Sequence, residues 1–206
     1  MRPRGAVYVL TGERGSGKTM VCAEVAADAR ARGLDVAGIL TGRSGPEPGD
    51  PRQVVDLRSG ESRPFGTQAP HDDAGARPKV RPPRAAAARV PGAVATAGTN
   101  SDPLTPGWEY ESEAFAWANE VLSSATPCDL LIVDEVGPLE LQGGRGWAQA
   151  IEVLRARDFG AALVVCRPGL LDELEASLGG PPAGVFRADL ENSDALTATI
   201  LEEMLG

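Results

Sequence analysis

The residues with the clearest potential for chemistry lie near the N-terminus, where Gly12 and Gly17-Lys18-Thr19 fit the spacing Gly-x-x-x-x-Gly-Lys-Thr. This spacing is typical of a loop that binds phosphate groups, because glycine lets successive backbone N–H groups surround phosphate oxygens. We expect Lys18 to reach the β- and γ-phosphates as a catalytic residue and the Thr19 hydroxyl to bind Mg²⁺. A glycine-rich turn that binds nothing is the alternative. The predicted nucleotide-binding residues are Gly12, Glu13, Arg14, Gly15, Ser16, Gly17, Lys18, Thr19 and Met20.

A second motif of the same kind is the apolar run Leu130–Val133 followed by Asp134 and Glu135. At the carboxyl end of a buried strand, Asp134 is expected to bind Mg²⁺ opposite Thr19. Glu135 is expected to be catalytic, orienting or deprotonating an attacking water. The motif is weak alone, since any buried strand can run into an acidic turn, but it becomes specific together with the upstream loop. The adjacent glutamate favours hydrolysis.

Two arginines are candidates for stabilising a transferring phosphoryl group. Arg167 directly follows the predicted strand Ala161–Cys166, and it is assigned a catalytic role if that strand neighbours the one before the loop. Its alternative is an ion pair with Asp172 or Glu173 at the start of a helix. Arg145 lies in a glycine-rich turn and is either an arginine of a mobile lid or a solvent-facing side chain.

These candidates are far apart in the sequence, so a scaffold must bring them together. Apolar runs alternate with amphipathic segments, which predicts an α/β fold: a three-layer sandwich whose mostly parallel sheet binds ligands at the carboxyl ends of its strands. Gln53–Leu57 and Ser62–Phe65 predict an added β-hairpin. The other expected strands are Ala6–Leu10, Asp35–Thr41, Leu130–Val133, Ala161–Cys166 and Val185–Ala188, and the expected helices are Met20–Arg30, Glu111–Ser124, Trp147–Arg157, Leu170–Leu178 and Asn192 to Leu205.

The segment 69–105 differs in composition from the rest of the predicted single domain, 1–206. Eight of the 17 prolines lie between Pro64 and Pro106, and few large apolar side chains are available to offset the entropy of ordering. We predict a flexible Pro/Ala/Arg-rich insert, whose basic side chains either tether an anion or are merely solvated; they are Arg77, Lys79, Arg81, Arg84 and Arg89. The aromatic residues beyond it, Trp108, Tyr110 and Trp117, are expected to pack onto the sheet, with base stacking as the alternative.

Composition excludes several other classes of function. The formal net charge is −9, which argues against general nucleic-acid binding. No apolar run approaches the ~20 residues that span a bilayer, and the early first strand leaves no room for a secretory signal. The cysteines, Cys22, Cys128 and Cys166, form no paired motif, so we expect buried thiols in a cytoplasmic protein. His71, in a loop-like stretch, is the only histidine, so we expect neither acid–base chemistry nor zinc chemistry based on histidine.

Taken together, the motifs make the chain resemble the small P-loop nucleoside-triphosphatase family, also described as nucleotide kinase-like. The resemblance rests on Thr11–Thr19, Val36–Leu40, Asp56–Glu61, Leu131–Leu141, Gly146-Trp147 and Val164–Pro168. It implies a P-loop NTPase fold and slow Mg²⁺-dependent hydrolysis of ATP, GTP and other nucleoside triphosphates to diphosphates. It further implies phosphate binding at Gly12 to Thr19 and a role for Asp134 and Glu135 in holding Mg²⁺ and water.

The chain departs from the family pattern in three places. Glu13 and Arg14 replace residues that are often small or apolar, Pro138 stands where lysine is frequent, and the insert is longer than usual.

The predicted function is hydrolysis of a nucleoside triphosphate. One alternative is a small-molecule or nucleotide kinase, which needs a pocket for an acceptor and a closing lid. The other is a non-enzymatic regulator that binds nucleotide and a partner protein. The sequence indicates no particular protein partner, no nucleic acid and no membrane.

Overall fold

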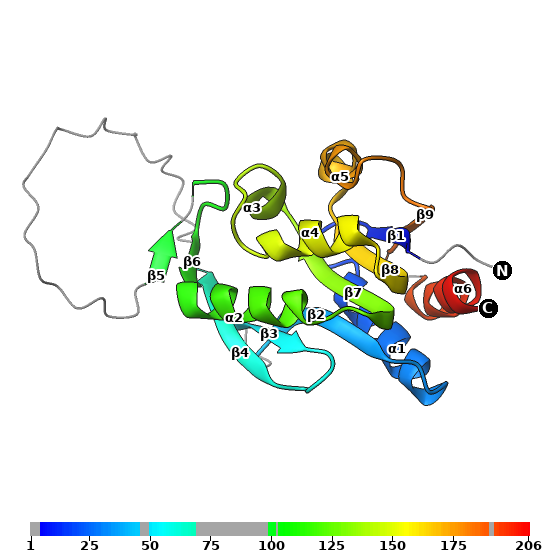
Figure 1. Ribbon diagram of the computed structural model, residues 1–206. Helices are drawn as coiled ribbons and strands as arrows, with labels where there is room; N and C mark the ends of the chain where they lie inside the picture. The colour runs from blue at the N-terminus through cyan, green and yellow to red at the C-terminus, as the bar shows by residue number, and fades with distance from the viewer. Residues whose placement is uncertain (1–4, 46–49, 69–98, 102, 190–191) are drawn as a thin grey trace, which may run out of the picture.

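The computed structural model describes residues 5–45, 50–68, 99–101, 103–189 and 192–206. Within these residues the strands are β1 (Ala6–Thr11), β2 (Val36–Arg43), β3 (Arg52–Asp56), β4 (Ser62–Gln68), β5 (Thr99–Ser101), β6 (Trp108–Glu111), β7 (Cys128–Val136), β8 (Phe159–Cys166) and β9 (Gly184–Arg187). The helices are α1 (Lys18–Ala31), α2 (Ser112–Ser123), α3 (Pro138–Leu141), α4 (Ala148–Ala156), α5 (Leu171–Leu178) and α6 (Ser193–Leu205). All the strands belong to one sheet, in the order β5-β6-β4-β3-β2-β7-β8-β1-β9 (Figure 1).

The sheet has a parallel part and an antiparallel part. Strands β2, β7, β8, β1 and β9 pair in parallel, and β3, β4, β6 and β5 extend the sheet beyond β2 in antiparallel fashion. The predicted α/β class, the mostly parallel centre and the added hairpin of β3 and β4 are confirmed. Strand β8 lies directly between β1 and β7, so the strand before Arg167 does neighbour the strand before the loop.

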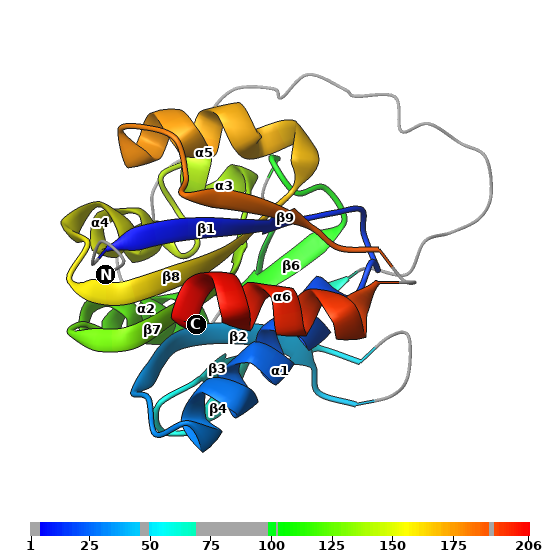
Figure 2. The same cartoon turned by 90° about the vertical axis from the view of Figure 1, so that its right-hand side faces the viewer.

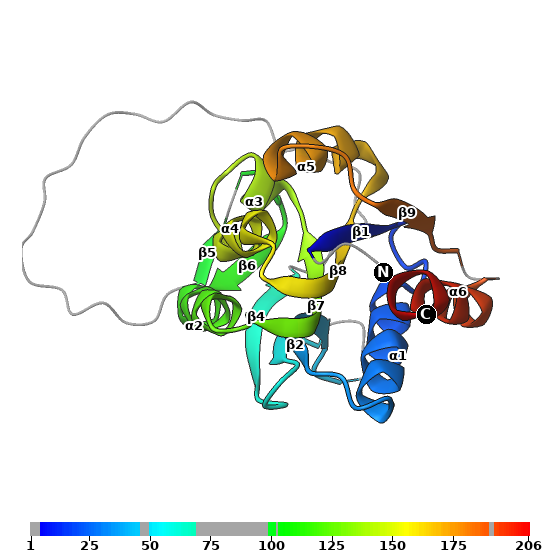
Figure 3. The same ribbon diagram turned by 45° about the vertical axis from the view of Figure 1, so that its right-hand side comes forward.

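Helices cover both faces of the parallel strands, which makes three layers. Alternate side chains of β1, such as Val7 and Tyr8, point into opposite apolar cores because successive strand residues face opposite sides. On one face α1 and α6 lie side by side, packing Val25 and Leu201 against the sheet (Figure 2). On the other face lie α2, α4 and α5, as Figure 3 shows. Helices therefore cover both faces of the parallel strands, and the loop and the acidic motif lie at the carboxyl ends of those strands.

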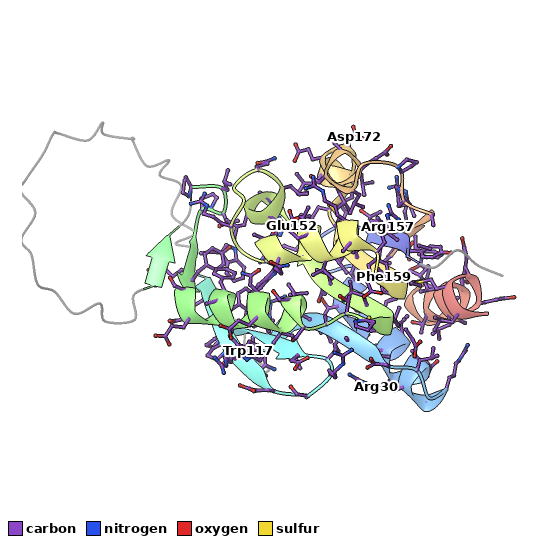
Figure 4. The ribbon with its side chains drawn as sticks, in the orientation of Figure 1. Arg30, Trp117, Glu152, Arg157, Phe159 and Asp172 are labelled. Carbon is purple, nitrogen blue, oxygen red and sulfur yellow. The ribbon has the colours of Figure 1, made fainter. Side chains whose placement is uncertain are left out.

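The antiparallel hairpin is fixed firmly to the parallel part. At its turn, the Arg58 guanidinium pairs with Asp35 at 2.7 Å and also donates to backbone carbonyls that precede β7. On β4, the Arg63 guanidinium lies 4.7 Å from the ring centroid of Trp117, which extends from α2 toward the hairpin (Figure 4). The Phe65 ring also packs edge-on against the Trp147 ring, with centroids 5.2 Å apart. These contacts hold β3 at a set position beside β2.

The aromatic side chains pack as expected. Trp108 stacks on Tyr110 with centroids 6.1 Å apart, and Tyr110 stacks on Phe65 at 6.5 Å. Tyr110 is buried in the core, and Trp117 is covered by Arg63. The base-stacking alternative therefore finds no support in these contacts.

Three short elements were not predicted: α3, β5 and β6. They span only three or four residues each, so they carry too little periodicity to be recognised in the sequence. Strand β5 lies at the C-terminal end of the range predicted as a flexible insert, while 69–98, with its basic residues and His71, lies outside the described residues. No helix in the described ranges is long and apolar enough to cross a membrane. All three cysteines are buried and free; the cytoplasmic location stays a prediction.

Candidate active site

Most of the candidate residues lie at the carboxyl ends of neighbouring parallel strands. The glycine-rich loop follows β1, Asp134 and Glu135 lie near the end of β7, and Arg167 follows β8 between them. The pairing of Val9 with Val164 and of Val133 with Val164 brings the three strands into one register. The sheet thus gathers at one edge the predicted phosphate, metal and water contacts, as expected for open parallel sheets.

The loop after β1 closes around the Lys18 ammonium group. Its Nζ donates to the carbonyl oxygens of Gly12 at 2.8 Å and Glu13 at 2.7 Å, and to the Ser16 hydroxyl at 3.3 Å. Gly15 and Gly17 have φ values of +80° and +86°, in the left-handed region that favours glycine. The result is a buried positive charge at the start of α1, surrounded by a loop whose turns only glycine adopts easily.

Gly12 is required for a different reason, because the end of β9 passes directly over the loop. A Cβ on Gly12 would collide with the Ala188 carbonyl oxygen and approach the Ser16 Oγ to 2.7 Å. The Ala188 N–H donates to the Thr11 carbonyl at 2.8 Å, which holds this crossing in place. The loop therefore surrounds Lys18 on one side and packs against Ala188, at the end of β9, on the other. Of the predicted loop residues, Glu13, Arg14, Gly15 and Met20 remain exposed.

The two predicted metal ligands meet. The side chain of Thr19 hydrogen-bonds to the Asp134 carboxylate, although one lies on α1 and the other on β7. Asp134 is only 1% exposed, and its Oδ2 also accepts from the Thr41 backbone N–H and Oγ1, both at 3.1 Å. Burial raises the pKa of Asp134 to about 6, although the hydrogen bonds from Thr19 and Thr41 lower it. A cation here would favour the ionised form.

The oxygen donors at this point fit Mg²⁺ better than a softer metal. Thr19 offers a hydroxyl and Asp134 a carboxylate, both hard oxygen ligands. Within the described ranges, no three or more His, Cys, Asp or Glu side chains gather into a group that could hold a metal by themselves. Mg²⁺ is commonly held by one or two protein oxygens with substrate phosphates and water. The pair therefore suits an ion that arrives with a nucleotide.

Glu135 and Arg167 form an ion pair. The Arg167 Nε donates to the Glu135 Oε1 at 2.6 Å, and the side chains are 58% exposed for Arg167 and 30% exposed for Glu135. The alternative partners of Arg167 were Asp172 and Glu173, but the Glu173 carboxylate instead accepts from the Gln142 amide at 2.9 Å. Arg167 is therefore placed beside the residue predicted to handle water.

Glu140 holds the segment after β7, a role that sequence reasoning did not assign. Its carboxylate is 9% exposed and accepts from the backbone N–H groups of Gly137 and Trp147, both at 2.8 Å. Burial raises the pKa of Glu140 from its ordinary value, while these hydrogen bonds lower it. Glu140 lies in the segment Leu131–Leu141, and the family resemblance of that segment was the sequence feature that could have pointed to this residue. Arg145, at the far end of this turn, is exposed and its backbone N–H donates to Leu139.

Thr41 and Arg52 were also missed, because neither lies in a motif. Thr41, on β2, is buried and contacts Asp134 as described. The Arg52 Nη2 donates to the Thr41 Oγ1 at 3.4 Å, from the first residue of the hairpin strand β3. Only the pairing of β2 with both β7 and β3 brings these three side chains together.

Comparisons with known proteins agree with this fold. No protein-family model and no curated protein matches the sequence. Among solved structures, a human cancer-related nucleoside triphosphatase is 20% identical, with a TM-score of 0.61 over 97% of this chain and 97% of that chain. THEP1 from the hyperthermophile Aquifex aeolicus is 14% identical, with a TM-score of 0.61 over 97% of this chain and 99% of that chain. The chain therefore shares the three-layer α/β fold of these two structures.

Proposed function

We propose that this chain is a Mg²⁺-dependent hydrolase that converts nucleoside 5′-triphosphates, ATP and GTP among them, to diphosphate and phosphate. The observation that carries the proposal is the meeting of Thr19 with Asp134 beside the Lys18 loop, with Glu135 next in the chain. The structural likeness to a protein named a nucleoside triphosphatase supports the same class of activity.

The loop provides phosphate binding. The Lys18 ammonium donates to the Gly12 and Glu13 carbonyls, which supports its proposed position inside the phosphate-binding loop. We expect it to exchange these carbonyls for phosphate oxygens, which form stronger charge-assisted hydrogen bonds. The backbone N–H groups of the loop and the first turn of α1 add further donors.

The metal would be held by Thr19 and Asp134. When bound, Mg²⁺ would supply positive charge to the phosphate oxygens of the substrate. The chain's own contribution is to keep Asp134 oriented, through the two hydrogen bonds from Thr41, and to exclude solvent from that carboxylate.

Glu135 would act on the attacking water. Its carboxylate accepts a proton or a hydrogen bond from the water, and the Arg167 guanidinium holds it in position. A guanidinium has five N–H donors, so Arg167 can hold Glu135 and still offer donors to a phosphoryl group. We therefore retain Lys18, Glu135 and Arg167 as the proposed catalytic residues.

The test is phosphate release from a panel of nucleoside triphosphates, with and without Mg²⁺, by the wild-type protein and the Glu135→Gln variant. Glu152→Gln is the matched control, because Glu152 is 65% exposed on α4, where it pairs with Arg155 rather than with a candidate site residue (Figure 4). We expect Mg²⁺-dependent release that Glu135→Gln loses and Glu152→Gln keeps. Nucleotide binding without release from any triphosphate would refute hydrolysis and favour the kinase or regulator alternatives.

A further inference from the structure

Arg52 is a partly buried cation with unused hydrogen-bonding capacity beside the candidate site. Its only hydrogen bond to another described residue is the one to Thr41 Oγ1, at 3.4 Å, and it forms no ion pair within the described ranges. Burial lowers the pKa of its guanidinium, whereas the nearby charges of Asp134 and Glu135 raise it. Most of its five N–H donors are thus left for another partner.

Further arginines surround Arg52. Arg43, at the end of β2, is its cross-strand neighbour in the antiparallel register of β2 and β3. The charges of Arg43 and of Arg14, from the glycine-rich loop, both lower the pKa of Arg52. Three cations from three segments therefore lie within electrostatic reach of one another. Like charges directly opposite on paired strands are unfavourable, so the arrangement favours an anion between them.

The position of Arg52 indicates which part of an anionic substrate it meets. Along the sheet the loop follows β1, the carboxylates Asp134 and Glu135 lie on β7, and Arg52 lies on β3 beyond β2. Arg52 thus approaches from the side opposite the loop, close to the residues proposed to bind metal and water. A phosphate chain held at one end by the loop would present its terminal group toward this side.

We propose that Arg52, assisted by Arg43, binds the terminal phosphate of the bound nucleoside triphosphate and so distinguishes triphosphate from diphosphate. This inference rests on the proposed nucleotide site and adds the hairpin to it. The rigid attachment of the hairpin through Arg58 and Arg63 gives Arg52 a defined position rather than a mobile one. The hairpin strand β3 then serves to recognise the substrate as well as to extend the sheet.

The test compares the affinities of the Mg²⁺ complexes of a non-hydrolysable ATP analogue and of ADP by calorimetry. Variants are Arg52→Ala and Arg52→Lys, with Arg30→Ala as the control, because Arg30 is an exposed arginine in the last turn of α1, outside the hairpin. Because Arg52→Ala loses a charge-assisted hydrogen bond, its affinity for the analogue should fall about tenfold or more, whereas its affinity for ADP should stay within about twofold of the wild-type value. Arg52→Lys should recover part of the lost affinity, and Arg30→Ala should change the affinity for neither nucleotide.

The other outcomes separate a failure of the Arg52 role from a failure of the nucleotide site. If Arg52→Ala lowered the affinities for the analogue and for ADP equally, or lowered neither affinity, the role of Arg52 would be overturned while the nucleotide site would stand. Weakened binding of a nucleoside monophosphate to the ADP-loaded protein, with analogue binding unchanged, would also overturn it and assign Arg52 to a phosphoryl acceptor. Failure of the wild-type protein to bind either nucleotide would overturn the proposed function and this inference together. Thermal unfolding of each variant shows whether the chain remains folded.

Discussion

Arg167 donates from Nε to the Glu135 Oε1 at 2.6 Å, which joins residues that are 32 positions apart in the sequence. The contact exists because β7 and β8 are parallel neighbours, so the ends of both strands reach the same edge of the sheet. Both side chains keep substantial exposure to solvent, and such surface pairs contribute little to folding. The contact therefore has its main consequence for the orientation of Glu135.

The first prediction concerns this pair. We expect Glu135→Gln to lower kcat by about a hundredfold or more and to keep triphosphate binding, because the water loses its base. Arg167→Ala should lower kcat in the wild-type background but add little to Glu135→Gln, since the two side chains act as a unit. Phosphate-release kinetics of the two single variants and the double variant measure the coupling. Fully additive losses would show that Arg167 acts independently of Glu135.

Lys18→Ala should abolish nucleotide binding. The ammonium group is the only lysine charge at the loop, and its replacement leaves the phosphate oxygens with backbone donors alone. We expect affinity for both triphosphate and diphosphate to fall by about a hundredfold or more. Arg30→Ala, an exposed change near the end of the same helix, should leave binding unaltered (Figure 4). Calorimetry with Mg²⁺ present measures these affinities. Wild-type nucleotide affinity in Lys18→Ala would contradict the role of Lys18 in phosphate binding.

The stability of the free protein should depend on pH through Asp134. Its pKa is about 6 in the folded protein against an ordinary value of 3.8, so the folded state holds the proton more tightly. Stability contributed by this group is therefore present near pH 4 and lost as pH rises through about 6. We expect Asp134→Asn to exceed the wild type in free energy of unfolding at pH 8, by up to roughly 3 kcal/mol, with little difference at pH 4.

Urea unfolding of both proteins without Mg²⁺ at the two pH values measures this effect. Because the change removes a proposed metal ligand, Asp134→Asn should also lose Mg²⁺-dependent phosphate release while it gains stability. A variant no more stable than the wild type at pH 8 would show that Thr19 and Thr41 fully compensate the burial of the carboxylate.

Glu140→Ala should destabilise the fold and disturb the site. The change leaves the buried N–H groups of Gly137 and Trp147 without an acceptor, which costs about 2 to 4 kcal/mol. Since Gly137 follows Glu135 closely, kcat should also fall. Glu152→Ala on α4 is the exposed control, and it should change the free energy of unfolding by less than about 0.5 kcal/mol. Unfolding curves equal to those of the wild type would contradict the anchoring role.

Local sequence was sufficient to predict the loop and the strands of the parallel sheet. The motif from Gly12 to Thr19 is recognised by its spacing within one segment. A run such as Leu130–Val133 favours a buried strand because it is shorter than a helix and is bounded by a polar turn. The added hairpin was predictable for the same reason, from two β-prone runs around a turn. The short strands β5 and β6 were not, because runs of three and four residues carry too little pattern to be recognised on their own.

Contacts between strands could not be predicted in this way. Arg52 stands between Pro51 and Gln53 with no motif around it, and it reaches Thr41 only through the register of β2 and β3. Glu140 and Thr41 likewise gain their roles from partners distant in the sequence. The pairing of Arg167 with Glu135 in place of Asp172 or Glu173 was decided by strand order.

The sequence by itself thus determined the glycine-rich loop around Lys18, the acidic strand end and the layered α/β architecture, since each depends on spacing or periodicity within one segment. The tertiary structure decided which charged groups meet: Thr19 with Asp134, Arg167 with Glu135, and Arg52 with Thr41. The physical reason is that electrostatic and hydrogen-bonding interactions act over a few ångströms in space, and only the order and register of the strands determine which distant residues come that close.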